Sequence, residues 1–191
     1  MERNTGVRES MEKEFFDVFP GLKVKKEMEE LLEPAKVSRI SCNREKTHLR
    51  IYLVSDKWIH KKYIYRLEDE MKRQLFGGIP MEVTVIEKFH LSAQYTPENF
   101  LDTYRESIRL ELRNTNMLEY SLFQSASIAF TGSHSMHLTL PDTVIGREKG
   151  EMLMEYLEKV FCQRCGMDLK IEPEFIPVKE SKYRRNSERM V

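Results

Sequence analysis

Apolar and polar positions alternate over residues 37–54, in two short runs separated by the polar turn NREK. Alternation with a period of two is typical of strands with one buried face, so this stretch predicts a β-hairpin. The second run has an apolar face, formed by Leu49, Ile51 and Leu53, and a polar, basic face, formed by His48, Arg50 and Tyr52.

A helical pattern follows the hairpin. Ser55 and Asp56 predict a helix start, and apolar residues then recur at four-residue steps, at Ile59, Tyr63, Leu67, Met71 and Leu75. Gly77 and Gly78 end this helix, and residues 81–86 predict a third strand. Two shorter helices are expected before the hairpin, one capped by Ser10 and ending at Pro20, the other over residues 23–32.

The same order of elements recurs in the second half of the chain. Helices are predicted from the Thr96 cap to about residue 112 and over 116–123, followed by a hairpin around the turn TGSH, a helix over 143–161 and a strand over 167–171. An offset of 86 residues aligns the back halves of the two units without a gap. It pairs Asp56 with Asp142, Ile59 with Ile145, Leu67 with Leu153, and Val83 with Leu169, so helix cap, buried face and closing strand are expected to coincide.

These patterns predict an α+β fold of two helix-helix-strand-strand-helix-strand units. Each unit is expected to form a three-stranded sheet with its helices on one face. The predicted domains are residues 1–90 and 91–176, with residues 177–191 as a charged linker or tail.

Charge is balanced overall, with 31 cationic and 31 acidic residues, so any nucleic-acid surface must be local. Residues 36–66 carry nine cations against two acids and contain interleaved aromatic residues. A basic surface with aromatic rings suits phosphates and bases, although the acidic run KEMEELLEP just before it allows a second reading, two solvated faces that partly neutralise each other. The candidate nucleic-acid-binding residues are Arg39, Arg50, Tyr52, Lys61 and Lys62.

No sequence motif supports a catalytic function. The sequence contains no nucleophile elbow, phosphate-binding loop or zinc-protease motif, and the five histidines are scattered, so no catalytic residue, metal or cofactor is predicted. Cys162 and Cys165 are spaced as in a redox or zinc motif, but they fall at the end of a helix, where a thiolate is not stabilised, and are expected to be small apolar residues beside a helix-ending Gly166. The N-terminus is charged and no apolar run is long enough to span a membrane, which indicates a cytoplasmic protein.

The order and spacing of the apolar positions are also similar to those of a known protein family. Residues 35–76, followed by ENFLDTYRESIRLEL and SMHLTLPDTVIGREKGEMLMEYLEKVF, resemble the N-terminal region of the polC-type DNA polymerase III alpha subunit, the replicase of low-GC Gram-positive bacteria. The likeness runs from about residue 10 to 178.

The resemblance implies a function. In that family this region forms two small domains ahead of the polymerase and exonuclease parts; the first is similar to the polymerase-contacting part of the clamp-loader tau subunit, the second to a truncated K-homology fold. The implied role is non-catalytic, in protein-protein interaction or positioning within the replisome, with clamp-loader or downstream polymerase domains as partners. The alternative is a module that binds single-stranded DNA through the basic residues 36–66.

Overall fold

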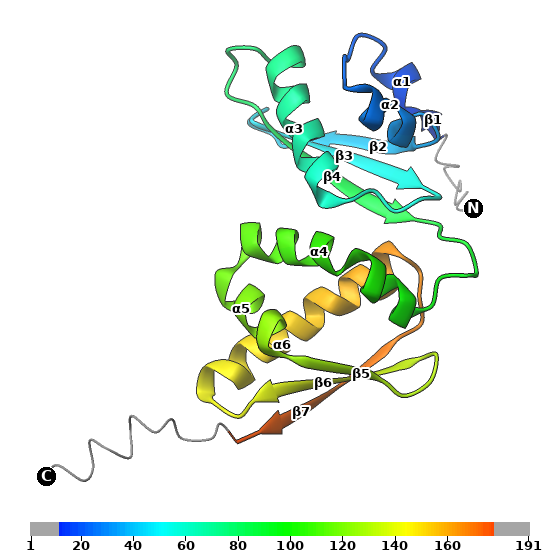
Figure 1. Cartoon of the computed structure of the whole chain (residues 1–191). Coiled ribbons are helices and arrows are strands. Elements are labelled where there is room, and N and C mark those ends of the chain that lie inside the picture. The colour runs from blue at the N-terminus through cyan, green and yellow to red at the C-terminus, as the bar shows by residue number, and fades with distance from the viewer. Residues whose placement is uncertain (1–11, 178–191) are drawn as a thin grey trace, which may run out of the picture. The chain divides into compact units, whose positions relative to one another are not determined.

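The computed structural model describes residues 12–177. The predicted cap at Ser10 and nearly all of the predicted tail lie outside these residues. The described chain divides into two compact units, one formed by the residues up to Tyr95 with Arg164–Gly166, the other by Thr96–Gln163 and the residues from Met167 onward (Figure 1). Each unit is described by itself below.

The first unit contains a mixed four-stranded sheet in the order β1-β2-β3-β4. The strand β2 runs antiparallel to both β1 and β3, whereas β3 and β4 are parallel and are joined by a crossover through α3. Its elements are β1 (Lys13–Glu14), α1 (Phe15–Val18), α2 (Lys26–Leu32), β2 (Lys36–Cys42), β3 (His48–Ser55), α3 (Lys61–Leu75) and β4 (Glu82–Phe89).

The second unit contains a three-stranded sheet in the order β5-β6-β7. The antiparallel pair β5 and β6 is followed by a parallel pair, β6 and β7, joined by a crossover through α6 (Figure 1). Its elements are α4 (Pro97–Thr115), α5 (Met117–Ser125), β5 (Ser127–Phe130), β6 (Ser135–Pro141), α6 (Val144–Glu158), a π-helical turn (Lys159–Arg164) and β7 (Lys170–Ile176). Two mixed sheets with helices confirm the α+β class.

The start of the first unit differs from the prediction. Residues 13–18 form a short strand and one helical turn instead of a continuous helix, so the first sheet has four strands and the predicted three is wrong. Lys13 pairs with Val37, and the Phe15 amide donates to the carbonyl of Ala35. Because the Phe15 ring is completely buried, its packing fixes the chain beside β2 and interrupts the helix.

The alternation in β3 is confirmed by the core. Ile51 and Leu53 are buried on the same face as Val83 and Val85 of β4, and this face packs under α3. The stripe predicted along α3 is only partly correct, since Leu67 and Met71 are buried but Leu75 is 40% exposed. A helix repeats every 3.6 residues, so a strict four-residue step drifts away from the core.

The helix α3 begins at Lys61, and the predicted start at Ser55-Asp56 is wrong. Trp58 and Ile59 are buried in the non-helical segment before it, and the Trp58 ring centroid lies 4.5 Å from that of Phe89. This packing holds the segment away from helical geometry. His60 then caps α3 by accepting a hydrogen bond from the Lys62 amide.

The second unit confirms the Thr96 cap, which forms a capping box with Asn99. The cap of α6 is Thr143, not Asp142 as the alignment of the halves predicted. The pairing of Leu67 with Leu153 holds because both are buried, but that of Ile59 with Ile145 fails, since Ile145 is 57% exposed. Gly146, next to it on α6, is buried in its place.

Candidate nucleic-acid interface

The face of the first sheet opposite α3 carries three of the predicted residues. Arg39 lies directly across from Tyr52, and Arg50 lies two residues before Tyr52 on the same strand, so all three side chains stand on one face. The apolar residues of β3 alternate with them and point to the helices. The alternating sequence of β3 therefore separates a core face from a basic face.

The contacts on this surface are polar and cationic. The Arg39 guanidinium carbon lies 5.3 Å from the centroid of the Tyr52 ring, a cation-π geometry. His48 Nε2 is 2.8 Å from Oγ1 of Thr84, which stands on β4 beside Arg50. We call Arg39, His48, Arg50, Tyr52 and Lys88 the basic face; Lys88 belongs to the same side of β4.

Among the described residues of β3 and β4, the side of the sheet that carries the basic face has one acidic residue, Glu82, at the start of β4. Glu82 lies across from His48, and Lys72 Nζ of α3 is 2.7 Å from its carboxylate. The pKa of Glu82 is lowered, first by this hydrogen bond and then by the charge of Lys72. Glu82 is thus already neutralised, and the basic face keeps its positive charge.

The other two predicted residues lie elsewhere. Lys61 is buried on the helix side of the sheet, where its Nζ is 2.7 Å and 2.9 Å from the two carboxylate oxygens of Glu87. Lys62 is exposed on α3, with Nζ 4.5 Å from the Tyr63 ring centroid. The structure does not bring Lys61 and Lys62 together with Arg39, Arg50 and Tyr52, and it leaves Lys61 inaccessible to a phosphate.

Comparison with known proteins bears on this unit. Residues 14–85 match the family described as DNA polymerase III polC-type N-terminus I. The first unit belongs to this family. The first unit therefore corresponds to part of the N-terminal region of a polC-type DNA polymerase III, which implies a role in DNA replication. A search of the curated proteins returns no match, and a search of the solved structures returns none. The K-homology likeness of the second unit stays a prediction.

The polC-type unit also holds a carboxylate that sequence reasoning did not single out. Glu68 of α3 accepts a hydrogen bond of 2.7 Å from the amide of Val85 on β4. Burial raises the pKa of Glu68 above its usual value, although this hydrogen bond and the charge of Lys61 act in the opposite direction. From the sequence, Glu68 cannot be distinguished from the solvent-exposed glutamates of the same helix, because its hydrogen-bond partner, the Val85 amide, is 17 residues away.

The second unit presents a different open face. Glu172 and Glu174 of β7 stand beside His137 and Thr139 of β6, and His137 Nε2 lies 3.6 Å from Glu172. Lys170 Nζ is 2.6 Å from Glu172, and its hydrogen bond is the main cause that lowers the pKa of that carboxylate. This face lacks the arginine and tyrosine cluster of the polC-type unit.

Cys162 lies in the π-helical turn that follows α6, and Cys165 comes directly after this turn. The Cys162 thiol donates to the carbonyl of Leu169 at 3.5 Å, and Gly166 has a positive φ of 66°, as predicted for a residue past a helix end. Within residues 12–177 no three His, Cys, Asp or Glu side chains gather as a metal site. Among these residues no helix is both long enough and apolar enough to cross a membrane.

Proposed function

We propose that the chain is a non-catalytic interaction and positioning region of a polC-type DNA polymerase III and acts by binding other replisome proteins. The observation that carries this proposal is a set of exposed apolar side chains, since such residues mark protein contacts when they gather in one place. A replicative polymerase works on the chromosome, so the proposal includes a cytoplasmic location. The partners proposed are the clamp loader or the downstream polymerase domains.

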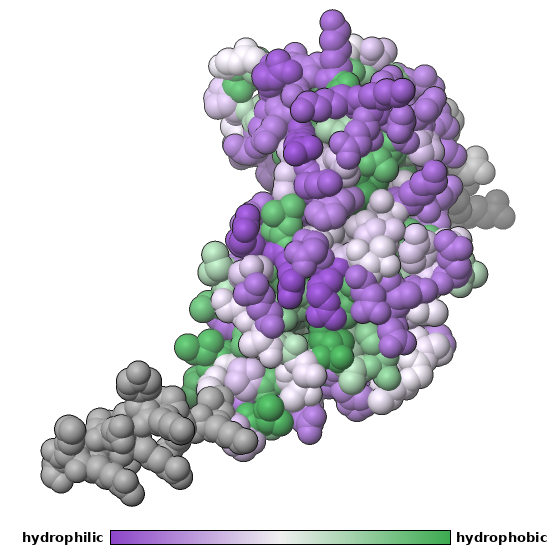
Figure 2. Space-filling view, in the orientation of Figure 1, coloured by the Kyte–Doolittle hydropathy of each residue, from purple (hydrophilic) through white to green (hydrophobic). Residues whose placement is uncertain are grey.

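Three of the exposed apolar residues, Val144, Ile145 and Ile176, lie at one edge of the second unit, where the Asp142 amide donates to the carbonyl of Ile176. Pro141 pairs with Ile176 at the ends of β6 and β7, and Val144 and Ile145 follow directly at the start of α6. Val144 is 74% exposed, and Pro141 and Ile176 line a mainly apolar hollow of about 380 Å³. Figure 2 shows more hydrophobic colour on the visible surface of the second unit than on that of the first.

The test is binding of the whole chain to a purified clamp-loader complex and, separately, to the downstream part of a polC-type polymerase, by biolayer interferometry. The double variant Val144→Asp, Ile145→Asp should weaken binding by about tenfold or more, since charges would have to be buried in an apolar contact. The matched control is Met117→Asp with Leu118→Asp, which charges two exposed apolar residues of α5. Absence of binding to both partners would contradict the proposal.

A second candidate function is binding of single-stranded DNA by the basic face. It is supported by the side-by-side arrangement of Arg39, Arg50 and Tyr52 on an open sheet face, which offers both phosphate contacts and a ring for base stacking. Titration with single-stranded DNA at several salt concentrations tests it. Replacing Arg39 and Arg50 by Glu should weaken binding and reduce the slope of log K against log salt by about 1.4, because each phosphate contact contributes about 0.7.

Lys62→Glu is the matched control for that experiment. It reverses an exposed charge of the same unit on the helix side of the sheet, so it should leave the DNA affinity nearly unchanged. No binding at low salt would exclude the second function. Equal losses for Lys62→Glu and for the arginine variants would contradict the assignment to the basic face.

A further inference from the structure

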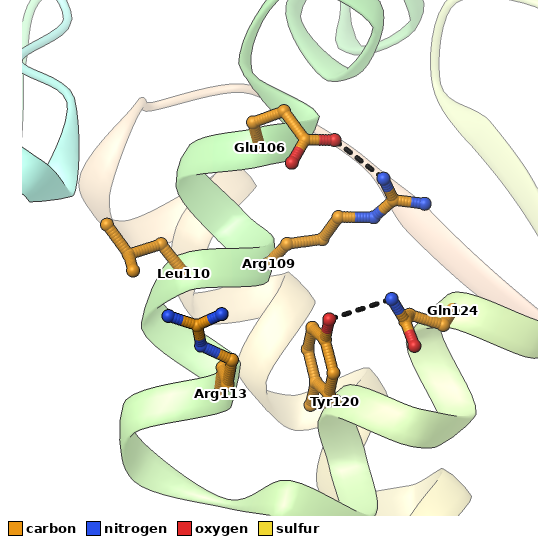
Figure 3. A pocket seen from close by; sticks show the side chains of 6 residues that line it. All are labelled: Glu106, Arg109, Leu110, Arg113, Tyr120 and Gln124. Carbon is orange, nitrogen blue, oxygen red and sulfur yellow. Dashed lines mark hydrogen bonds and ion pairs between the residues drawn. The ribbon is translucent and has the colours of Figure 1, made fainter.

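A polar hollow lies between α4 and α5 of the second unit (Figure 3). Its volume is about 170 Å³, several times the roughly 30 Å³ that one water molecule occupies in the liquid. It can therefore admit a compact polar group. The lining residues are Glu106, Arg109, Leu110, Arg113, Tyr120 and Gln124.

The local sequence explains why these side chains face each other. Arg109 and Arg113 are one turn apart on α4 and share a helix side. Tyr120 and Gln124 have the same spacing on α5. Asn116 ends α4 and caps α5, so the two helices meet at one residue and turn these two rows toward a common space, as Figure 3 shows.

Several donors in the hollow have no acceptor. Glu106 accepts from Nη1 of Arg109 at 2.6 Å, but the Nε of Arg109 is buried and has no hydrogen-bond partner among residues 12–177. Within the same residues, Arg113 makes no ion pair or hydrogen bond. The Tyr120 oxygen accepts from Gln124 at 2.7 Å, which leaves the phenol hydrogen to be donated.

The charges in the hollow favour an anion. Two guanidinium groups face one carboxylate, and like charges one helical turn apart repel each other. Donors also outnumber acceptors, since Glu106 accepts from one nitrogen of Arg109 and Arg113 has no acceptor among residues 12–177. A small anion with several acceptor oxygens would correct both features.

We propose that this hollow binds a phosphate group. The guanidinium of Arg113 donates to two of its oxygens, the Nη2 of Arg109 to another, and the Tyr120 hydroxyl completes the set. Guanidinium groups match phosphate geometry with paired donors, and donors from both helices surround a tetrahedral group better than a flat carboxylate. The phosphate can be free or part of a nucleotide, and the site is independent of the proposed protein contacts and of the basic face.

The test is a titration of the whole chain with inorganic phosphate, at constant ionic strength held with sodium chloride, followed by NMR of the arginine Nε–H groups. We expect saturable shifts of Arg109 and Arg113. A parallel titration with thymidine 5′-monophosphate identifies the source, since equal affinity indicates recognition of the phosphate alone and tighter binding indicates a nucleotide.

Variants separate this site from general attraction of anions. Arg113→Gln should weaken phosphate binding by about tenfold or more, and Tyr120→Phe, which removes only the hydroxyl, by roughly threefold. Arg44→Gln is the matched control because Arg44 is an exposed arginine in the hairpin turn of the other unit. Uniform shifts of all exposed arginines, or an Arg113→Gln variant that binds phosphate as tightly as the natural chain, would overturn the proposal.

Discussion

The crossover helices of the two units approach their sheets differently. At the position where α3 buries Ile64, α6 carries Gly150, and a Cβ atom placed there would lie 2.7 Å from Cδ1 of Leu140 on β6. Gly146, one turn earlier, is closer still to the backbone of Pro141. In the second unit, glycines on α6 let the helix lie close to the sheet. In the first unit, the large Ile64 side chain fills the space between α3 and the sheet.

The charged residues differ in the same way. The first unit buries the ion pair of Lys61 and Glu87 and has a basic open face, whereas the open face of the second carries Glu172 and Glu174. Two units that share the order strand-strand-helix-strand can therefore bind different ligands. The order fixes the path of the chain, and the side chains at equivalent positions fix the surface.

The largest expected effect is on the buried ion pair of the first unit, Lys61 with Glu87. Lys61→Ala should destabilise that unit by about 3–5 kcal/mol, because the Glu87 carboxylate would be left buried without its cation. Fluorescence of Trp58, the single tryptophan, measures this loss during urea unfolding. The double variant Lys61→Met, Glu87→Leu should recover most of the stability, because neither side chain then leaves a buried charge. If it does not, the ion pair itself stabilises the unit more than apolar residues of similar size do.

Truncation of the paired core leucines should have a somewhat smaller effect. Leu67→Ala and Leu153→Ala each remove a buried side chain from equivalent positions and should cost about 3 kcal/mol. Leu67→Ala should lower the urea midpoint seen by Trp58 fluorescence. Leu153→Ala should lower the midpoint of circular dichroism while the Trp58 midpoint stays. A shift of the Trp58 midpoint by both variants would mean that the units unfold together.

A methyl group at Gly150 tests the close approach of α6. Gly150→Ala should destabilise the second unit by about 1–3 kcal/mol, since the added atom overlaps Leu140, which is itself buried. The readout is the midpoint of thermal unfolding by circular dichroism. Gly21→Ala is the control, because no atom lies within 4 Å of a Cβ placed there. A stabilised Gly150→Ala variant would show that the space between α6 and β6 can hold the added methyl group.

The smallest effect is expected at Glu68. Its pKa is raised in the folded state, so the charged form opposes folding, and stability falls as the pH rises from its usual pKa through the folded one. Glu68→Gln keeps the acceptor for the Val85 amide and should stabilise the first unit at neutral pH by about 0.5 kcal/mol. The gain should vanish well below the usual pKa of a glutamate. A gain that is the same at both pH values would exclude this cause.

Local sequence patterns predicted the structure correctly where neighbouring residues alone determine it. The alternation of β3 and the Thr96 cap depend on neighbouring residues and are confirmed. The start of α3 could not be predicted, because the packing of Trp58 on Phe89 involves residues 31 positions apart. The same holds for Lys61, whose charge reads as exposed until Glu87 is placed beside it.

The interface candidates were predicted unevenly for the same reason. Arg39, Arg50 and Tyr52 share a face because strand pairing follows from the hairpin, which is a local feature. The hollow beside Arg113 depends on the angle at which α4 meets α5, and no periodicity in the sequence encodes that angle. Residues on one strand can be grouped from sequence, whereas those on two helices require the structure.

The Glu68 hydrogen bond has a consequence for self-association. Within residues 12–177 the strand β4 lies at the end of its sheet, with one side not covered by another strand, and such an edge can accept a strand from a second molecule. The Glu68 carboxylate occupies the outward amide of Val85 in the middle of this edge, so an incoming strand would find that donor already taken. One side chain of the crossover helix thus helps to keep the sheet from extending into a neighbour and aggregating.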